Sequence, residues 1–230
     1  MPATSPKRKR SLIRRLLVWC LLLVAAFYTL AALAFLTLRW IDPPFTMVHV
    51  QRRIESWFHR GPYQRRYVFV PLDSISPPFQ HAVIAAEDAR FFHHHGFDWH
   101  EVHEAVEDGL DDGKLRGAST IDEQLAKNLF LTTNRSLLRK GLEVTLVPLE
   151  ELILSKRRIL ELYLNVVEWG PGVYGAEAAA RYHYSVPASR IGREQGARLA
   201  AILPSPRRRQ PARMNRYAAR ILTRMEQMGW

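Results

Sequence analysis

The chain has 230 residues, of which 47% are hydrophobic, and 33 lysine and arginine residues outnumber 22 acidic residues, which gives a formal net charge of +11. This composition, with 12 glycines and 14 prolines, excludes a disordered or collagen-like chain and predicts one folded domain with a short additional segment. A single cysteine, Cys20, excludes an intrachain disulfide and a cysteine-built metal site. Six of the positive charges lie within residues 1–15. Part of the net positive charge therefore belongs to an N-terminal tail, and the charge does not indicate a nucleic-acid partner.

An uncharged run of 23 residues, 16–38, predicts a membrane-spanning helix, because at 1.5 Å per residue it exceeds a hydrocarbon core of about 30 Å. The basic residues lie before this run, and only Arg39 follows it closely. The positive-inside rule therefore predicts a cytoplasmic tail at 1–15 and a domain outside the cytoplasm. A cleaved signal peptide is the alternative, since Ala32-Leu33-Ala34 resembles a cleavage site. The run continues past that site and is longer than a usual signal peptide core, so we predict a retained anchor.

The chain beyond the anchor is predicted to hold one mainly α domain. Residues 39–78 are expected to form a juxtamembrane connection, with a breaker at Asp42-Pro43-Pro44 and a short strand at 65–70. Residues 79–230 are expected to form the domain, since strand-like alternation is almost absent there. Helical periodicity is found at 79–92, 98–112, 120–131, 136–165, 175–203 and 214–228.

The first candidate for chemistry is the pair Glu87-Asp88 near the end of the helix expected at 79–92. Glu87 follows Val83 by four residues and therefore lies at the edge of the apolar stripe, whereas Asp88 is turned toward another side. A carboxylate against apolar surface has its pKa raised by desolvation, which suits a general base near neutral pH. A capped or solvated helix end explains the same residues without any chemistry.

The second candidate is the helix that follows the small residues 117–119. Ser119 or Thr120 is its predicted N-cap, and Thr120 with Glu123 has the spacing of a capping box. The polar face of this helix carries Gln124, Lys127 and Asn128. An ion pair of Lys127 with Glu123, four residues before it, is the structural alternative.

A group of cations follows in the chain. Lys127, Arg135, Arg139 and Lys140 lie within fourteen residues. Arg139 and Lys140 precede Glu143 by four and three residues, so both are within reach of it on a helix. This chemistry suits a diphosphate, although a solvated charged face is the common alternative.

Three further features concern the chain path. Pro148 predicts a kink or break in the helical stretch, and Ser155 is a candidate cap for the helix after it. The segment 170–175, Gly-Pro-Gly-Val-Tyr-Gly, predicts a turn between helices.

Together these segments resemble the peptidoglycan glycosyltransferase family, specifically its short, monofunctional, membrane-anchored biosynthetic transglycosylases. The resemblance covers about Val70 to Pro206. Five blocks match in order, at 87–96, 117–128, 139–143, 156–165 and 170–175. The sequence contains neither Ser-x-x-Lys nor Lys-Thr-Gly, so the transpeptidase domain of the bifunctional relatives is not expected.

The resemblance implies a lysozyme-like fold and the polymerisation of lipid II, with inversion, onto a glycan carried by undecaprenyl diphosphate. It implies that Glu87 is the general base and that Glu143 is a second catalytic carboxylate, which orders the cations or a divalent metal such as Mg²⁺. Lys127 and Arg135 would hold the leaving diphosphate. The pocket around it would be shaped by Ser119, Gln124, Asn128, Arg139 and Lys140.

The resemblance also implies a location and partners. The protein is expected in the bacterial inner membrane with a periplasmic catalytic domain, with no organic cofactor and with other cell-wall synthases as candidate partners. His94, Gly96 and the glycine turn are expected to support the site rather than react.

The sequence departs from the family pattern at three acidic positions. Asp122 and Glu123 stand where the family usually has Ser or Thr and then Gln, and Glu104 stands where Arg is common. Like charges beside a diphosphate site weaken binding unless they are turned away or bridged by a metal. A non-catalytic membrane scaffold of the same fold is therefore one alternative function.

Two other functions are alternatives. A lysozyme-like lytic hydrolase would use Glu87 as an acid, but a neutral glycan gives no reason to gather four cations. A metal site would draw on the histidines at 93, 94, 95, 100 and 103 with Glu101 and Glu104, but their spacing does not match His-Glu-x-x-His, and a solvated loop is the simpler interpretation.

Overall fold

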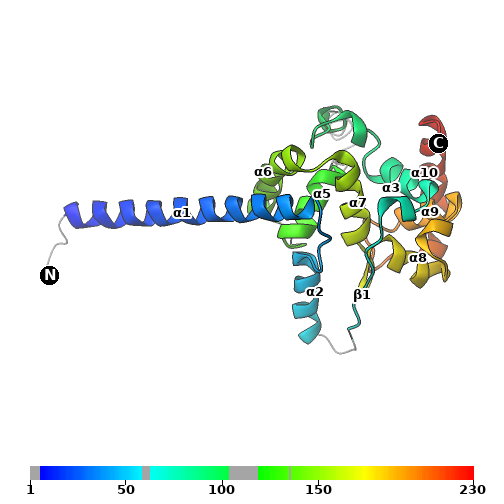
Figure 1. Ribbon diagram of the computed structural model, residues 1–230, viewed down its shortest axis with the longest axis horizontal. Helices are drawn as coiled ribbons and strands as arrows, with labels where there is room; N and C mark the ends of the chain where they lie inside the picture. Colours follow the sequence, from blue (N-terminus) through cyan, green and yellow to red (C-terminus); the bar gives the residue numbers. More distant parts are fainter. Residues whose placement is uncertain (1–5, 59–62, 104–118, 135) are drawn as a thin grey trace.

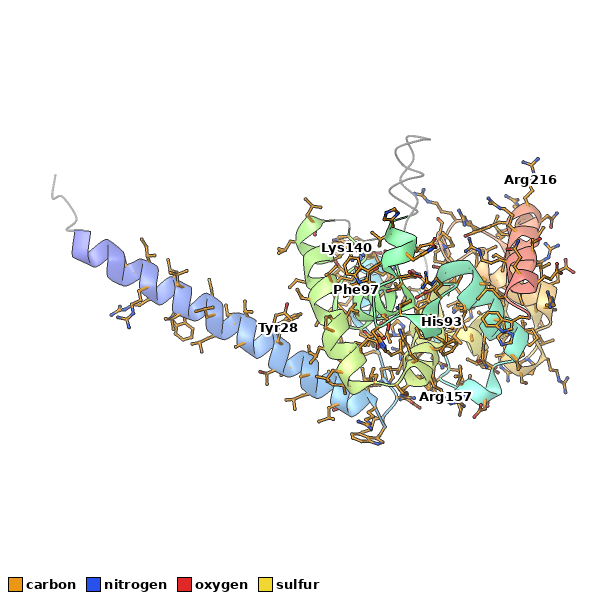
Figure 2. All side chains as sticks on the ribbon, turned by 90° about the horizontal axis from the view of Figure 1, so that it is seen from above. Tyr28, His93, Phe97, Lys140, Arg157 and Arg216 are labelled. Carbon is orange, nitrogen blue, oxygen red and sulfur yellow. The ribbon has the colours of Figure 1, made fainter. Side chains whose placement is uncertain are left out.

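The computed structural model describes residues 6–58, 63–103, 119–134 and 136–230, and shows a long helix joined to a helical body. Helix α1 (Pro6–Leu38) projects away from the body (Figure 1). Its segment Leu12–Leu38 has a mean hydropathy of 2.5 and, within the described residues, is the one helix long and apolar enough to cross a membrane. Most of its side chains extend outward without protein neighbours (Figure 2), as a lipid-facing helix requires.

The C-terminal part of α1 packs on the body. Tyr28 Oη lies 2.5 Å from Thr145 Oγ1 of α6 (Leu137–Ile153). The ring of Phe35 meets that of Phe130, at the end of α5 (Ile121–Phe130), edge to face with a centroid distance of 4.8 Å. Tyr28 lies ten residues before the end of α1. The domain helices that lie beside the C-terminal part of the anchor are therefore α5 and α6.

The segment 39–78 contains more regular structure than a plain connection. Helix α2 (Met47–Trp57), which the periodicity did not predict, is capped by Thr46, whose hydroxyl accepts a hydrogen bond from the backbone of His49. The strand expected at 65–70 is confined to β1 (Arg66–Tyr67). It pairs in parallel with β3 (Val173–Tyr174), which pairs antiparallel with β2 (Glu168–Gly170).

Two predicted helices end earlier than their periodicity suggests. Helix α3 (Pro77–Glu87) stops at Glu87, and the chain continues through a 3-10 turn at Phe91–His93. The stretch at 136–165 divides into α6 and α7 (Lys156–Val166). Pro148 lies inside α6 and does not end it, whereas the predicted cap Ser155 accepts a hydrogen bond from the N–H of Arg158 at 3.3 Å.

The remaining helices follow in the same way. The stretch at 175–203 divides into α8 (Ala176–Tyr184) and α9 (Arg193–Ala200). The last stretch forms α10 (Asn215–Gln227). Of the stretch at 98–112, residues 99–103 are helical, and 104–112 lie outside the described residues. Short 3-10 turns complete the chain at Leu72–Ser74, Ala188–Arg190 and Pro211–Arg213.

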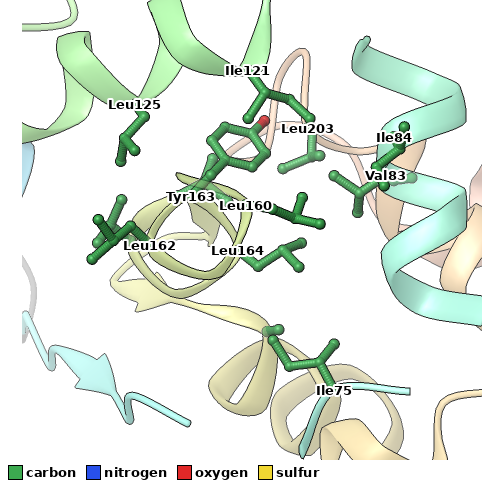
Figure 3. Close-up of a cluster of buried hydrophobic side chains, with 14 of the residues drawn as sticks. Ile75, Val83, Ile84, Ile121, Leu125, Leu160, Leu162, Tyr163, Leu164 and Leu203 are labelled. Atoms are coloured by element: carbon green, nitrogen blue, oxygen red, sulfur yellow. The ribbon is translucent and has the colours of Figure 1, made fainter. Parts of the chain in front are cut away.

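Helix α7 lies at the centre of the core. Leu160, Leu162, Tyr163 and Leu164 are each at most 1% exposed, so the helix is apolar on nearly all sides. Figure 3 shows these side chains between those of α3 and α5. Burying one such side chain contributes about 1.5–3 kcal/mol, so this contact fixes the relative positions of the two helices that carry the candidate site.

The predicted turn at 170–175 is confirmed, and two of its glycines are required by the backbone. Gly172 and Gly175 have φ of +73° and +85°. A Cβ at Gly172 would lie 2.4 Å from the carbonyl oxygen of Gln64, and one at Gly175 would lie 2.5 Å from that of Asn165. The turn therefore brings the β2–β3 hairpin against β1 and the end of α7.

Candidate active site

A cleft of about 1370 Å³ separates the helices beside the anchor from the distal helices. In Figure 1, α5 and α6 lie next to α1, whereas α3, α9 and α10 form the far end of the body. Glu87 reaches the cleft from the end of α3, and Gln124 and Lys127 reach it from α5. The opposite wall is formed by α10 and the segment before it.

Glu87 is held by a chain of hydrogen bonds that begins in the core. Tyr163, which is fully buried in α7, donates to Oε1 of Gln124 at 3.0 Å. The amide nitrogen of Gln124 donates to Oε2 of Glu87 at 2.8 Å. Burial raises the pKa of Glu87, and the bond from Gln124 and the charge of Lys127 oppose this rise. The carboxylate is therefore oriented and more basic than an ordinary glutamate.

Asp88 has a different environment, as the helix geometry predicted. Its two oxygens lie 2.9 and 3.0 Å from Nε2 of His94, and Oδ2 also accepts the backbone N–H of Ile121 at 3.0 Å. Asp88 therefore joins the end of α3 to the first residue of α5. Thr120, the N-cap of α5, donates to the carbonyl of Gly96 at 2.7 Å. His94 and Gly96 thus support the site, in agreement with the expectation.

Glu143 lies at the centre of a second cluster on α6. Its carboxylate is 3% exposed, accepts from the guanidinium of Arg139, and lies 2.7 Å from Nζ of Lys140. Lys140 also reaches Glu123 at 2.9 Å and donates to Oγ of Ser119 at 3.2 Å. The predicted contacts of Glu143 with Arg139 and Lys140 are confirmed. Both cations are held in place by one buried carboxylate.

Lys127 lies between the two clusters and pairs with neither. Burial lowers the pKa of Lys127, as do the charges of Arg139 and Lys140, while Glu143 and Glu87 oppose this effect. Its ammonium has no hydrogen bond or ion pair with the residues that the structure describes. The alternative that Lys127 pairs with Glu123 is wrong, because Glu123 bonds to Lys140 and to the backbone N–H of Thr120. The charge of Lys127 is thus available to an anion in the cleft.

The structure places the predicted site residues in two groups. Glu87, Ser119, Gln124 and Lys127 line the cleft. Asn128, Arg139, Lys140 and Glu143 lie beside it, and the side chain of Asn128 donates to the carbonyl of Gln124 at 2.7 Å. Arg135 lies outside the described residues.

Sequence reasoning missed a row of arginines on the far wall of the cleft. These residues are Arg209, Arg213, Arg216, Arg220 and Arg224. In the described part of the chain none of them forms an ion pair. Arg216, Arg220 and Arg224 follow one another at intervals of four, which is a visible sequence signal, since residues at this spacing share a helix face. Tyr163 gave no such signal, because only packing shows that its hydroxyl reaches Gln124.

Comparison with known proteins agrees with this geometry. A family model described as "Transglycosylase" matches residues 53–228. The chain belongs to the transglycosylase family. A biosynthetic peptidoglycan transglycosylase of Pseudomonas entomophila is 48% identical over 84% of each chain. That of Pseudomonas aeruginosa is 44% identical over 96% of this chain and 94% of its own. The predicted family and the mainly α, lysozyme-like fold are confirmed.

The acidic departures from the transglycosylase pattern are turned away from the cleft where the structure describes them. Asp122 is fully buried, and Nζ of Lys156 lies 3.1 Å from each of its oxygens. Glu123 completes the capping box of α5 and binds Lys140. Glu104 lies outside the described residues. Neither Asp122 nor Glu123 therefore opposes a diphosphate in this transglycosylase.

The described residues contain one group that could hold a metal ion, Asp88, His94 and Asp98, with ligand atoms within 4.8 Å of one another. Asp88 and Asp98 line the cleft and offer carboxylate oxygens, the ligands that Mg²⁺ prefers. Both oxygens of Asp88 contact Nε2 of His94, and Asp98 accepts two backbone N–H groups and lies 3.8 Å from Arg90, so a cation would have to replace some of these contacts. Glu143 does not fit such an ion, because Arg139 and Lys140 already neutralise it. The side chains of His93, His95 and His100 are exposed and not part of this group.

Proposed function

We propose that this transglycosylase is a peptidoglycan glycosyltransferase, which polymerises lipid II into glycan strands and releases undecaprenyl diphosphate. The observation that carries the proposal is the position in one cleft of a partly buried, oriented carboxylate, Glu87, and of the ammonium of Lys127, which has no ion pair among the described residues. A glycosyl transfer from a diphosphate needs both a base and a cation.

In the proposed reaction Glu87 accepts the proton of the 4-hydroxyl of the incoming sugar. The oxygen then attacks the anomeric carbon of the donor from the face opposite the diphosphate, so that the new bond forms as the bond to the diphosphate breaks, with inversion. Gln124 holds Oε2 of Glu87, which leaves Oε1 for the hydroxyl. The raised pKa makes Glu87 a stronger base than an ordinary glutamate.

The departing diphosphate gains negative charge as the bond breaks. Lys127 is placed to stabilise this charge, and partial burial strengthens its attraction for an anion. Glu143 would act indirectly, since it fixes Arg139 and Lys140 at the edge of the same site. In this proposal Glu143 orders the cations and does not transfer a proton.

The lipid carrier of the substrate fits the position of the cations. Arg139 and Lys140 lie on α6, which packs along α1 through the contact of Tyr28 with Thr145. The chain is therefore a single-pass membrane protein whose diphosphate site lies on the side of the anchor. We propose that α1 crosses the inner membrane with its basic end in the cytoplasm, which leaves the cleft in the periplasm with the lipid II acceptor.

A divalent cation belongs to the same proposal. Asp88 and Asp98 are the residues that would hold it at the cleft, and its charge would add to that of Lys127 beside a diphosphate. We expect polymerisation to fall when EDTA is added and to recover with Mg²⁺. Asp98→Asn should raise the Mg²⁺ concentration that gives half-maximal activity. Polymerisation that is unaffected by EDTA and by Asp98→Asn would exclude a role for a divalent cation at this site.

The first experiment is polymerisation of fluorescent lipid II by the detergent-purified protein. Wild-type protein should give a ladder of glycan strands, and Glu87→Gln should give none. Glu194→Gln is the matched control, because Glu194 is exposed on α9 and its one ion pair in the described part of the chain is with Arg198. Both variants should keep the melting temperature of the wild type within a few degrees.

Two other results would direct the assignment elsewhere. Soluble muropeptides released from purified sacculi, with no ladder, would favour the lytic hydrolase. A folded wild-type protein that gives neither product would favour the non-catalytic scaffold.

A further inference from the structure

Helix α2 is docked on the body by its polar side. Gln51 exchanges two hydrogen bonds with Thr133, from its amide nitrogen at 2.9 Å and to its amide oxygen at 2.8 Å. The guanidinium of Arg52 donates to Glu168 of β2 at 3.0 Å. In an ordinary surface helix, polar side chains such as these face water and do not contact the protein body.

The apolar side of α2 faces outward. Met47, Val50, Ile54 and Trp57 follow the helical spacing and are 37–68% exposed. An amphipathic helix in a water-soluble domain has the opposite arrangement, with its apolar stripe on the core. A continuous exposed apolar face marks a contact with lipid or with another protein.

A groove lies along this face. It has a volume of about 520 Å³, which is in the range of ligand pockets, and its lining is almost entirely apolar. The residues around it are Phe45, His49, Val50, Arg53, Ile54, Trp57, Tyr63 and Arg65. The groove thus offers a mostly apolar surface to a hydrocarbon chain, and its lysine and arginine residues are Arg53 and Arg65 alone.

Those two arginines are not neutralised. Arg53 lies over the ring of Tyr63 with its guanidinium carbon 5.9 Å from the centroid, and Arg65 lies 5.4 Å from that of Tyr67. Neither has an ion pair with any described residue. Burial and the charge of Arg65 lower the pKa of His49 to about 4, so this histidine is neutral at pH 7 and adds no charge to the groove.

The groove lies at the end of the membrane anchor. In Figure 1, α2 runs across the direction of α1, level with its C-terminal end. Trp40 and Phe45, which lie between the two helices in the chain, are 70% and 60% exposed. Exposed aromatic residues at this level are typical of the interface between hydrocarbon and headgroups.

From these observations we propose that α2 is an interfacial helix and that its groove binds an anionic phospholipid, with an acyl chain along Val50, Ile54 and Trp57 and the phosphate at Arg53 and Arg65. The anchor places this face among lipids, and the two unpaired guanidinium groups match the charge of the phosphate. The diphosphate of the substrate is served by a different set of cations, those around Lys127, so the groove does not depend on the proposed function.

Lipid selectivity tests the headgroup. Full-length protein is reconstituted in vesicles of equal phosphatidylglycerol and phosphatidylethanolamine, extracted in mild detergent, and analysed by native mass spectrometry. Wild-type protein should retain phosphatidylglycerol in preference to phosphatidylethanolamine. Arg53→Gln/Arg65→Gln should reduce this preference about 30-fold, the factor expected for the loss of two arginines near an anionic lipid.

The matched control is Arg66→Gln/Arg190→Gln, which makes the same charge change at two exposed positions outside the groove. It should retain phosphatidylglycerol as the wild type does. Equal retention by the groove variant and the control would overturn the proposal. Selective retention of undecaprenyl diphosphate added to the vesicles, in place of phosphatidylglycerol, would also overturn it and would assign the groove to the lipid carrier of the substrate.

A depth measurement tests the helix independently of the headgroup. Cys20→Ser removes the native thiol, and Ile54→Cys then accepts a nitroxide label. In vesicles, the label at position 54 should be accessible to oxygen and shielded from a water-soluble nickel complex. The same label at Ser189→Cys, an exposed position near α8, should show the reverse. A label at position 54 as open to nickel as that at 189 would exclude an interfacial helix.

Discussion

The amide nitrogen of Gln124 donates a hydrogen bond of 2.8 Å to Oε2 of Glu87, which joins the middle of α5 to the last residue of α3. An ionised carboxylate only accepts hydrogen bonds, so the amide nitrogen of Gln124 faces Glu87, and the amide oxygen accepts from Tyr163 at 3.0 Å. A buried tyrosine in the core thus holds the other end of this amide in place. The basicity of Glu87 therefore depends on two residues that do not react.

The first prediction concerns the pH dependence of polymerisation. Gln124 stabilises the ionised form of Glu87, so Gln124→Ala should raise the pKa of Glu87 further. A general base is active when deprotonated, and the acid limb of the pH–rate profile should move to higher pH by about one unit. Tyr163→Phe should cause a smaller shift in the same direction. The exposed variant Gln210→Ala should leave the limb in place, and an unshifted limb in Gln124→Ala would contradict the relationship.

The second prediction concerns Glu143. Glu143→Gln removes the negative charge that holds Arg139 and Lys140, so these cations repel each other beside Lys127. We expect a raised KM for lipid II and a loss of about 1.5–3 kcal/mol in the free energy of unfolding, the range for hydrogen bonds to charged groups. Denaturant unfolding and initial rates measure the two effects. A variant with unchanged KM and stability would show that the cluster does not depend on this carboxylate.

The third prediction concerns the arginines of α10. Figure 2 shows Arg216 at the outer end of this helix, with Lys140 nearer the anchor. Arg216→Gln/Arg220→Gln should raise KM about tenfold, since each exposed charge contributes up to about 1 kcal/mol to binding an anionic substrate. The value of kcat should change little, because neither residue belongs to the hydrogen-bond chain that orients Glu87. Arg66→Gln/Arg190→Gln serves as the control, and equal KM values in both variants would exclude a substrate role for α10.

The fourth prediction concerns stability and pH at Asp122. Burial raises the pKa of this carboxyl to about 7 from an ordinary value of 3.8. The folded protein therefore binds more protons than the unfolded chain between these values, and its stability falls as the pH rises through this window. Asp122→Asn, which stays neutral, should match the wild type near pH 4 and exceed it by about 1–2 kcal/mol at pH 8. Denaturant midpoints at both pH values measure this, and a difference independent of pH would contradict it.

The sequence predicted the features that depend on local pattern. The anchor, the helix caps at Thr120 and Ser155, and the pairing of Glu143 with its neighbours at three and four residues all follow from spacing along the chain. The glycine turn follows for the same reason. Helix α2 was missed because its apolar stripe is only eleven residues long and lies in a segment that breakers and the anchor marked as a connection.

Helix ends were less well predicted, since tertiary contacts decide them. The apolar periodicity continues past Glu87, but the helix stops there because Asp88 bonds to His94 and to the backbone of Ile121. These partners are 6 and 33 residues away, and no local signal identifies the second.

By itself the sequence determined the membrane anchor, the mainly α class, the family and the inventory of acids and cations, because each of these depends on residue type and spacing alone. Only the tertiary structure decided which acid faces which cation. It turned Asp122 and Glu123 away from the cleft, left Lys127 without an ion pair among the described residues, and placed the arginines of α10 opposite Glu87. The reason is that a charge acts on whatever lies within a few ångströms of it, and those distances are fixed by the packing of α3, α5 and α10 around the buried helix α7.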